Sequence, residues 1–378
     1  MAQNSLKEEL EAREARLARR EKERAFRKKL LLILAGIIVL LALLILLTLG
    51  MLFYSRMKSD AYSAAAAETV ADMPMTYVGE KTETEVREAI IEPVAKPDKL
   101  VPTLMTGEVV SANVYMYRPE DQKEILNIEA EAQIYPASMT KMMTALIAIE
   151  ELDLKQTHFV MYDEVSLAVT QDATRAGFSE GEEVTIEDLL YGALLPSGAE
   201  CCYALASEVI EKQAGSTQWD YETRFVELMN KKAAEIGMKN TQFTNCVGVQ
   251  SPDHYSTCKD MAKLLEYGLN NETFKTIIST HTYTTTPTEY HPDGLALTST
   301  MFASMGSSIL PNETSIRGGK TGYTDEAGHC LASYADTEDE TRYILVTGGG
   351  YTEVNDYSNI SDAKYLYGQL PRDAYEGE

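Results

Sequence analysis

Three short motifs along the chain carry hydroxyl and amine side chains of the kind used in nucleophilic catalysis. Ser138 and Lys141 form an S-x-x-K motif, Ser197 follows in a Pro-Ser-Gly-Ala segment, and Lys320 and Thr321 begin a Lys-Thr-Gly triplet. A serine hydroxyl is a poor nucleophile until a neighbouring base removes its proton. A lysine one helical turn away can act as that base if burial makes its neutral form accessible.

The S-x-x-K spacing is not specific by itself. It also occurs at Ser55/Lys58, Ser256/Lys259 and Ser361/Lys364. For an isolated tetrapeptide, the simpler interpretation is a serine that caps a helix and a lysine that faces solvent. Ser138 differs from the others because an apolar helical run follows it, which predicts a buried helix with Lys141 on the same face.

The Lys-Thr-Gly triplet occurs once, on the predicted strand 316–323. Glycines on a strand edge allow another backbone to approach closely. An ordinary glycine-rich turn would explain this segment alone. The fixed order of the three motifs, on a helix start, an inter-helix loop and a strand, is what points to one active site.

In this order the motifs resemble those of the penicillin-binding serine D-alanyl-D-alanine carboxypeptidases, within the wider S-x-x-K / S-x-N / K-T-G group. The resemblance covers about residues 107–370. It is strengthened by the segments Gly237–Thr241, His254–Thr257 and Lys320–Gly328. It implies a β-lactamase/penicillin-binding-like fold, peptidoglycan stem peptides ending in D-Ala-D-Ala as substrates, and covalent inhibition by β-lactams.

The resemblance also implies the catalytic roles. Ser138 attacks the carbonyl between the two D-alanines and Lys141 takes its proton. Ser197 helps to pass a proton to the leaving amine. No metal ion or other cofactor takes part.

A second set of residues is implied in substrate binding. Lys320 and Thr321 meet the terminal carboxylate of the peptide, and Gly322 completes the triplet. The backbone N–H groups of Ser138 and Tyr323 form the oxyanion hole, in which one donor contributes about 3 kcal/mol.

The sequence departs from the family pattern at two places. Ala199 stands where the family usually has asparagine, so an amide partner for the lysine or the substrate is missing, unless Glu200 or a water replaces it. The literal S-x-N at residues 111–113 precedes the nucleophile and is out of order. No arginine lies between Arg342 and Arg372, where relatives commonly place one near the substrate carboxylate.

Two other functions share these motifs. A β-lactamase needs a carboxylate for deacylation, and residues 266–270 match E-x-x-L-N by letters. That segment continues the apolar spacing of Met261, Leu264 and Leu265, so an amphipathic helix explains it more simply. The other alternative, which Ala199 motivates, is a penicillin-binding scaffold in cell-wall assembly that has lost turnover.

The elements that must position these motifs form one domain, residues 104–370. Hydrophobic patterning predicts strands at 109–117, 125–134, 316–323, 329–334 and 342–347, and helices at 139–152, 186–195, 200–211, 221–236, 260–269 and 360–367. This order indicates a mixed α/β fold with a mostly antiparallel sheet of about five strands, flanking helices and a helical insertion.

The N-terminal part predicts a membrane anchor. Residues 30–54 are 25 residues without a charge, long enough to cross a bilayer. Residues 1–29 hold ten Lys/Arg and six Asp/Glu, which favours a cytoplasmic N-terminus. A cleaved signal peptide is the alternative, although its apolar core is shorter. Residues 55–103 are a predicted linker and 371–378 a tail, so the catalytic domain is expected on the cell-wall side of the membrane.

Composition excludes other classes of function. The formal net charge of −24 opposes binding to nucleic acid. The five histidines are scattered, and no cysteine pair has metal-ligand spacing, so we expect no metal site. Cys201 and Cys202 lie in an apolar helical pattern and are predicted to be buried in the core, without a disulfide framework.

Overall fold

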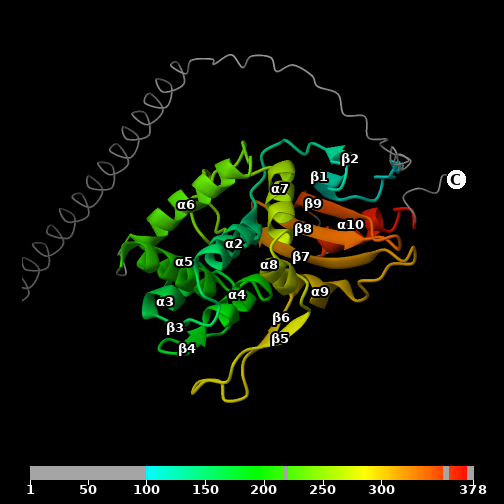
Figure 1. Ribbon diagram of the computed structural model, residues 1–378. Helices are drawn as coiled ribbons and strands as arrows, with labels where there is room; N and C mark the ends of the chain where they lie inside the picture. The colour runs from blue at the N-terminus through cyan, green and yellow to red at the C-terminus, as the bar shows by residue number, and fades with distance from the viewer. Residues whose placement is uncertain (1–98, 100, 216–219, 352–356, 373–378) are drawn as a thin grey trace, which may run out of the picture. The chain divides into compact units, whose positions relative to one another are not determined.

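The computed structural model describes residues 99, 101–215, 220–351 and 357–372 (Figure 1). The predicted segments 1–29 and 30–54 lie outside these residues, as do nearly all of the predicted linker 55–103 and all but the first two residues of the predicted tail 371–378. Within the described ranges, no helix is both long enough and apolar enough to cross a membrane.

A five-stranded antiparallel sheet is the centre of the fold, as the sequence predicts. Its strand order is β2-β1-β9-β8-β7. The strands are β1 (Ser111–Arg118), β2 (Lys123–Ile128), β7 (Ser315–Thr324), β8 (Gly328–Asp336) and β9 (Arg342–Gly350). The motif strand β7 is therefore at one edge of the sheet, where its outer side is free to meet the helices.

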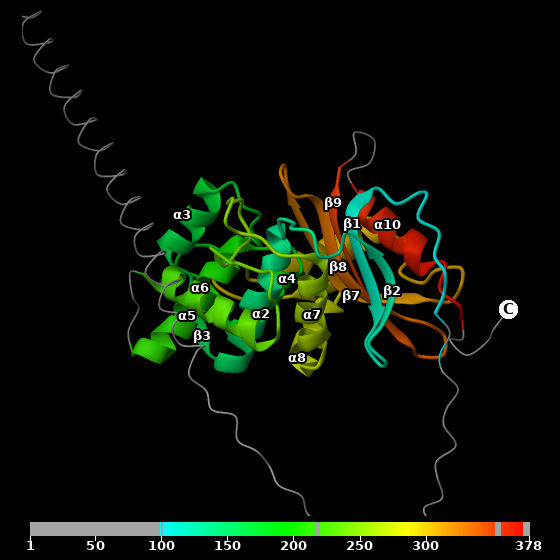
Figure 2. The ribbon, with the colours of Figure 1, turned by 90° about the horizontal axis from the view of Figure 1, so that it is seen from above.

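Helices fill the chain between β2 and β7 and form a lobe beside the sheet (Figures 1 and 2). After the 3₁₀ turn η1 (Ala137–Thr140), they are α2 (Lys141–Glu151), α3 (Tyr162–Thr170), α4 (Ile186–Leu194), α5 (Ala199–Ala214), α6 (Tyr221–Glu235), α7 (Cys258–Leu269), α8 (Glu272–Ile278) and α9 (Thr300–Met305). The closing helix α10 (Ser358–Tyr367) lies on the opposite face of the sheet from α7 (Figure 2). This confirms the predicted helical insertion.

Alternate residues of β1 supply two hydrophobic cores. Val114 and Met116 pack with Leu366 of α10, whereas Tyr115 and Tyr117 belong to the larger core shared with the helical lobe. Side chains of a strand point alternately to its two faces, so one strand can close both cores. The nucleophile turn η1 and α2 are anchored in the larger core.

Several elements differ from those that the sequence predicts. The predicted strand 125–134 ends at Ile128, because Glu129 turns the chain with a left-handed φ of 44°. Two small antiparallel sheets were not predicted, because each of their strands has three residues, too few to show a hydrophobic period. They are β3 (Thr157–Phe159) with β4 (Glu183–Thr185), and β5 (Thr282–Thr284) with β6 (Ala296–Thr298). The helices α3, α8 and α9 were also missed.

The five cysteines are buried free thiols. Cys201 and Cys202 are fully buried on α5, as predicted. Burial raises the pKa of the Cys202 thiol to about 12, so it remains protonated at neutral pH. These residues behave as small apolar side chains of the core.

Candidate active site

Ser138 sits in a tight turn that is locked against the edge strand. The residue before it, Ala137, has a left-handed φ of 46°, and η1 begins there. Gly322 of β7 packs directly on this turn: a Cβ at that position would lie 2.9 Å from the Pro136 carbonyl oxygen and 3.1 Å from the Ser138 nitrogen. Glycine is required here because any side chain would push the strand away from the nucleophile.

Lys141 lies directly behind the nucleophile. Its Nζ donates a hydrogen bond to Ser138 Oγ at 2.9 Å and another to the Val247 carbonyl oxygen at 2.6 Å. The side chain is only 2% exposed, at the first turn of α2. Burial lowers the pKa of the Lys141 ammonium below its ordinary value, which makes the neutral amine accessible as a base.

Ser197 and Lys320 form a second hydroxyl–amine pair. Ser197 lies in the loop between α4 and α5 with a left-handed φ of 71°. Lys320 Nζ donates to Ser197 Oγ at 2.9 Å and to the Thr321 carbonyl oxygen at 3.0 Å. Lys320 is fully buried, and burial, followed by the charge of Lys141, holds its pKa well below the ordinary lysine value.

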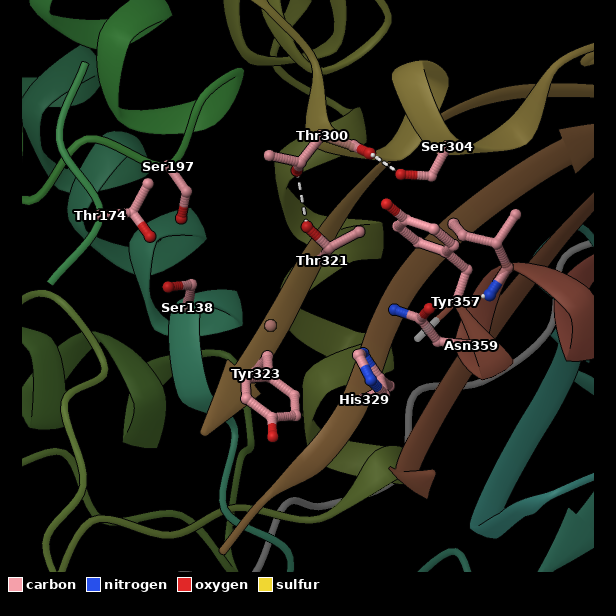
Figure 3. A pocket seen from close by; sticks show the side chains of 12 residues that line it. Ser138, Thr174, Ser197, Thr300, Ser304, Thr321, Tyr323, His329, Tyr357 and Asn359 are labelled. Carbon is pink, nitrogen blue, oxygen red and sulfur yellow. Dashed lines mark hydrogen bonds between the residues drawn. The ribbon is translucent and has the colours of Figure 1, made fainter. Parts of the chain in front are cut away.

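A cavity of about 260 Å³ opens between these pairs and the sheet (Figure 3). Ser138, Ser197 and Thr321 face it from three different elements. Thr321 shares a hydrogen bond of 2.6 Å with the hydroxyl of Thr300, the first residue of α9. The other residues that line the cavity are Thr174, Ser304, Gly322, Tyr323, His329, Tyr357, Asn359 and Ile360.

The structure brings all seven predicted site residues to this one place. Five of them line the cavity, and the two lysines contact it through the serine hydroxyls. The other S-x-x-K pairs in the described residues are not comparable. Lys259 pairs with Glu131 at the surface, and Lys364 donates to the Met305 carbonyl oxygen.

Several groups at the site were missed by sequence analysis. The Val247 carbonyl that accepts from Lys141 belongs to the loop 245–249, and a backbone carbonyl leaves no signal in the sequence. Asn245 and Gly248 are a recognisable turn pattern within that loop. Thr300 belongs to a helix of only six residues, which has too few residues to show a period.

The structure shows the surroundings of Ala199, which replaces the usual asparagine, and of the neighbouring Glu200. Ala199 is fully buried, and its nitrogen donates to the Thr174 carbonyl oxygen at 2.8 Å. Glu200 accepts from the Gly177 nitrogen at 2.8 Å, while its other carboxylate oxygen is buried without a partner in the described part of the chain. Glu200 is therefore not a hydrogen-bond substitute for the missing asparagine at Lys141.

The E-x-x-L-N match and the missing arginine can also be compared with the cavity. Glu266 lies on the amphipathic helix α7, where it accepts hydrogen bonds from Tyr117 and from Gln122. It is not among the residues that line the cavity. Neither a carboxylate nor an arginine is present among the described side chains of that lining.

Comparison with known proteins agrees with this geometry. The family model described as D-alanyl-D-alanine carboxypeptidase, peptidase S11, matches residues 108–352. The chain is 33% identical over 233 residues to D-alanyl-D-alanine carboxypeptidase DacF of Bacillus subtilis, covering 61% of this chain and 55% of that protein. It is 31% identical over 206 residues to a Streptomyces D-alanyl-D-alanine carboxypeptidase, covering 53% of this chain and 68% of the relative. The chain thus spans about half the length of the Bacillus relative.

Solved structures show the same fold. The crystal structure of a Streptomyces DD-transpeptidase is similar with a TM-score of 0.60 and 27% identity, covering 69% of this chain and 97% of the other. A D-alanyl-D-alanine carboxypeptidase structure from Mycobacterium tuberculosis has a TM-score of 0.59 at 20% identity, covering 71% and 95%. The second likeness concerns the fold alone.

Proposed function

Because the chain belongs to the peptidase S11 family of D-alanyl-D-alanine carboxypeptidases, we propose that it is a serine-type D-Ala-D-Ala carboxypeptidase. Its substrates are peptidoglycan stem pentapeptides, from which it removes the terminal D-alanine, and β-lactams inhibit it covalently. The observation that carries this proposal is the hydrogen bond of 2.9 Å between a buried lysine, Lys141, and the hydroxyl of Ser138 at the cavity.

The proposed reaction begins with acylation. The neutral Lys141 amine takes the proton of Ser138 Oγ as this oxygen attacks the carbonyl between the two D-alanines. Donors already fixed where negative charge develops lower the barrier most effectively. The backbone N–H groups of Ser138 and Tyr323 are suited to this role, since Gly322 holds β7 against the nucleophile turn.

Breakdown of the tetrahedral intermediate needs a proton on the leaving amine. Ser197 is suited to pass it, because its hydroxyl faces the cavity and is held by Lys320 from behind. Water then attacks the acyl group on Ser138 and releases the shortened peptide. In each turnover the proton that Lys141 takes from Ser138 ends on the leaving amine by way of Ser197, and the proton that the attacking water loses returns to Ser138 Oγ.

The substrate carboxylate is bound without an arginine in the described cavity lining. Thr321 is the proposed contact, with its hydroxyl oriented by Thr300 at 2.6 Å. The buried Lys320 behind them adds positive potential when it is protonated. Hydroxyl donors and a buried amine together suit a carboxylate at this end of the cavity.

A second candidate, a penicillin-binding scaffold without turnover, is favoured by Ala199 alone. Both functions predict acylation of Ser138 by a β-lactam, whereas only the enzyme releases D-alanine. A β-lactamase is disfavoured, because Glu266 is engaged by Tyr117 and Gln122 away from the cavity.

The test is covalent labelling with a fluorescent penicillin, followed by mass spectrometry of the labelled peptide. We expect one adduct, on the peptide that contains Ser138, and no adduct in Ser138→Ala. A folded wild-type protein that remains unlabelled would contradict both the enzyme and the scaffold. Rapid loss of the label with hydrolysed penicillin would instead favour the β-lactamase.

The location at the membrane is also a proposal. We infer from the sequence that residues 30–54 anchor the protein as a single-pass segment, with residues 104–370 on the cell-wall side. Carbonate-resistant association with membranes, together with digestion of the catalytic domain by protease added to spheroplasts, is the expected result. Release of the full-length chain by carbonate would contradict the anchor.

A further inference from the structure

Lys141 has a hydrogen-bond acceptor that lies outside the three sequence motifs. Ala199 has no amide to offer, although asparagine is usual at this position in the family. Lys141 Nζ nevertheless donates to the Val247 carbonyl oxygen at 2.6 Å, in addition to Ser138. The geometry of the base therefore depends on where the loop 245–249 holds that carbonyl.

Asn245 organises this loop from within. Its Oδ1 accepts from three successive backbone nitrogens, those of Val247 at 3.2 Å, Gly248 at 2.7 Å and Val249 at 3.2 Å. Its Nδ2 donates to the Val249 carbonyl oxygen at 3.0 Å. Four bonds from one buried side chain fix the turn and so fix the direction of the Val247 carbonyl.

The loop is also fixed from outside. On α2, Thr144 Oγ1 donates to the Cys246 carbonyl oxygen at 2.6 Å. Gly248 has a left-handed φ of 85°, and a Cβ there would lie 1.9 Å from the Ala137 carbonyl oxygen. The loop is therefore in backbone contact with the turn that presents Ser138.

His254 closes the network. Its Nδ1 faces two donors, the Thr244 nitrogen at 3.1 Å and Asn245 Nδ2 at 3.3 Å. Nδ1 must therefore accept, which places the proton on Nε2, 2.8 Å from Thr140 Oγ1. Burial, followed by the charge of Lys141, lowers the pKa of His254 to about 4, so the ring stays neutral.

We propose that Asn245 is a positioning residue for Lys141: it holds the Val247 carbonyl in place of the amide that is missing at Ala199. The inference rests on the function proposed above, because it concerns the base of that reaction. If Asn245 has this role, the effects of substitutions at positions 199 and 245 on the rate of acylation depend on each other, although the two residues do not belong to the same motif.

The test is a double-mutant cycle on the full-length chain, with the rate of acylation by fluorescent penicillin as readout. We expect Asn245→Ala to lower this rate at least tenfold. In the Ala199→Asn background, where an amide is again available, the same substitution should cost less than a third as much. Equal losses in the two backgrounds would overturn the proposal, since they would show that the two positions are independent.

A matched control is present nearby. Asn230 of α6 anchors Phe243 through its side chain, accepting from the Phe243 nitrogen and donating to its carbonyl oxygen, both at 2.8 Å, but it does not contact the loop 245–249. Asn230→Ala should destabilise the protein without coupling to position 199. If Asn245→Ala does not fold, Thr144→Val removes a hydroxyl at nearly constant volume and should show the same coupling. An uncoupled Thr144→Val would then count against the proposal.

The pH dependence of the acylation rate distinguishes a role of Asn245 in positioning Lys141 from a general loosening of the loop 245–249. The titratable groups around Lys141 are Glu200, Cys201 and Cys202 of α5, Cys246 of the loop, His254, and Lys320 of β7. None of these groups is itself substituted in Asn245→Ala, and His254 loses one of the donors that face its Nδ1. Loss of a carbonyl acceptor disfavours the ammonium, so the acidic limb of the acylation profile should move to lower pH while the plateau falls. A shift to higher pH would indicate water entry and would overturn the proposal.

The same labelling experiment tests the proposed function and the positioning role of Asn245 separately. Wild-type protein that folds but is not labelled would refute the proposed function. Labelled wild-type protein in which Asn245→Ala and Asn230→Ala react equally would refute only the positioning role.

Discussion

Lys320 donates a hydrogen bond of 2.9 Å to Ser197, a residue 123 positions earlier in the chain. The contact joins the edge strand of the sheet to the loop between two helices of the lobe. It repeats the relationship of Lys141 to Ser138, which is also 2.9 Å, at the same cavity. Two buried amines therefore each hold one serine hydroxyl toward the same space.

The second pair gives the first prediction. Ser197→Ala removes the partner of a buried amine and the proposed route of a proton to the leaving group. We expect D-alanine release to fall about 100-fold or more, the usual range for a lost acid–base group. The control is Ser207→Ala, which changes a buried serine on α5 that does not line the cavity and should retain nearly full activity. A Ser197→Ala protein with wild-type turnover would remove Ser197 from the mechanism.

Burial of Lys141 predicts the pH dependence of acylation. The neutral amine is the active form, and burial lowers its pKa below the ordinary lysine value near 10.5. The rate of acylation by penicillin should therefore rise with pH and reach its plateau below that value. Lys141→Met should abolish this rise and lower the plateau about 100-fold or more. A wild-type rate that still increases above pH 10.5 would contradict the proposed base.

Thr300 gives a prediction on substrate binding. Thr300→Val removes the hydroxyl that lies 2.6 Å from Thr321 and leaves the proposed carboxylate contact free to rotate. One such hydrogen bond is worth about 1 kcal/mol, so KM for the peptide should rise several-fold with little change in kcat. The KM of Ser304→Ala is measured for comparison, because the Ser304 hydroxyl donates to the Thr300 carbonyl oxygen. An unchanged KM in Thr300→Val would exclude this orienting role.

How far the sequence could predict this site depends on the kind of group involved. Ser138, Lys141, Ser197 and Lys320 were found because side chains in a fixed order leave a pattern of letters. The Val247 carbonyl could not be found in this way, since every residue type has a backbone carbonyl. Asn245 could have been noticed as a turn residue, but only the fold reveals that its turn points a carbonyl at the base.

The fold was predictable where an element was long. The strands that became β7, β8 and β9 and the helices α4 to α7 have enough residues to show a period. The error at β2 arose because apolar residues continue to Ile134 after the strand has ended. Ile134 forms an isolated bridge to Ser256 instead of a ladder with β1. Three-residue strands depend on tertiary partners, which a local pattern cannot indicate.

A buried histidine of the helical lobe predicts a pH dependence of stability. His158 lies 2.9 Å from Glu164 and 2.7 Å from Glu208. Burial alone would lower its pKa, but the two glutamate hydrogen bonds outweigh it and raise the pKa to about 9. The unfolded value is near 6.5. The contribution to stability, roughly 3 kcal/mol, is thus fully present below pH 6.5 and is lost as the pH rises through about 9.

The measurement is urea denaturation of the wild type and of His158→Gln between pH 6 and 9.5. We expect the free energy of unfolding of the wild type to fall across this range, while the variant, which is less stable at pH 6, falls much less. Parallel curves for the two proteins would show that His158 does not titrate in this window.

The most direct test of the proposed function is D-alanine release from a peptide ending in D-Ala-D-Ala, measured for the full-length chain beside Ser138→Ala. We expect catalytic release by the wild type and none by the variant, although both are folded. This result would also show that turnover tolerates Ala199. A folded wild-type protein that releases no D-alanine, yet is acylated by penicillin at Ser138, would contradict the proposed carboxypeptidase and leave the scaffold.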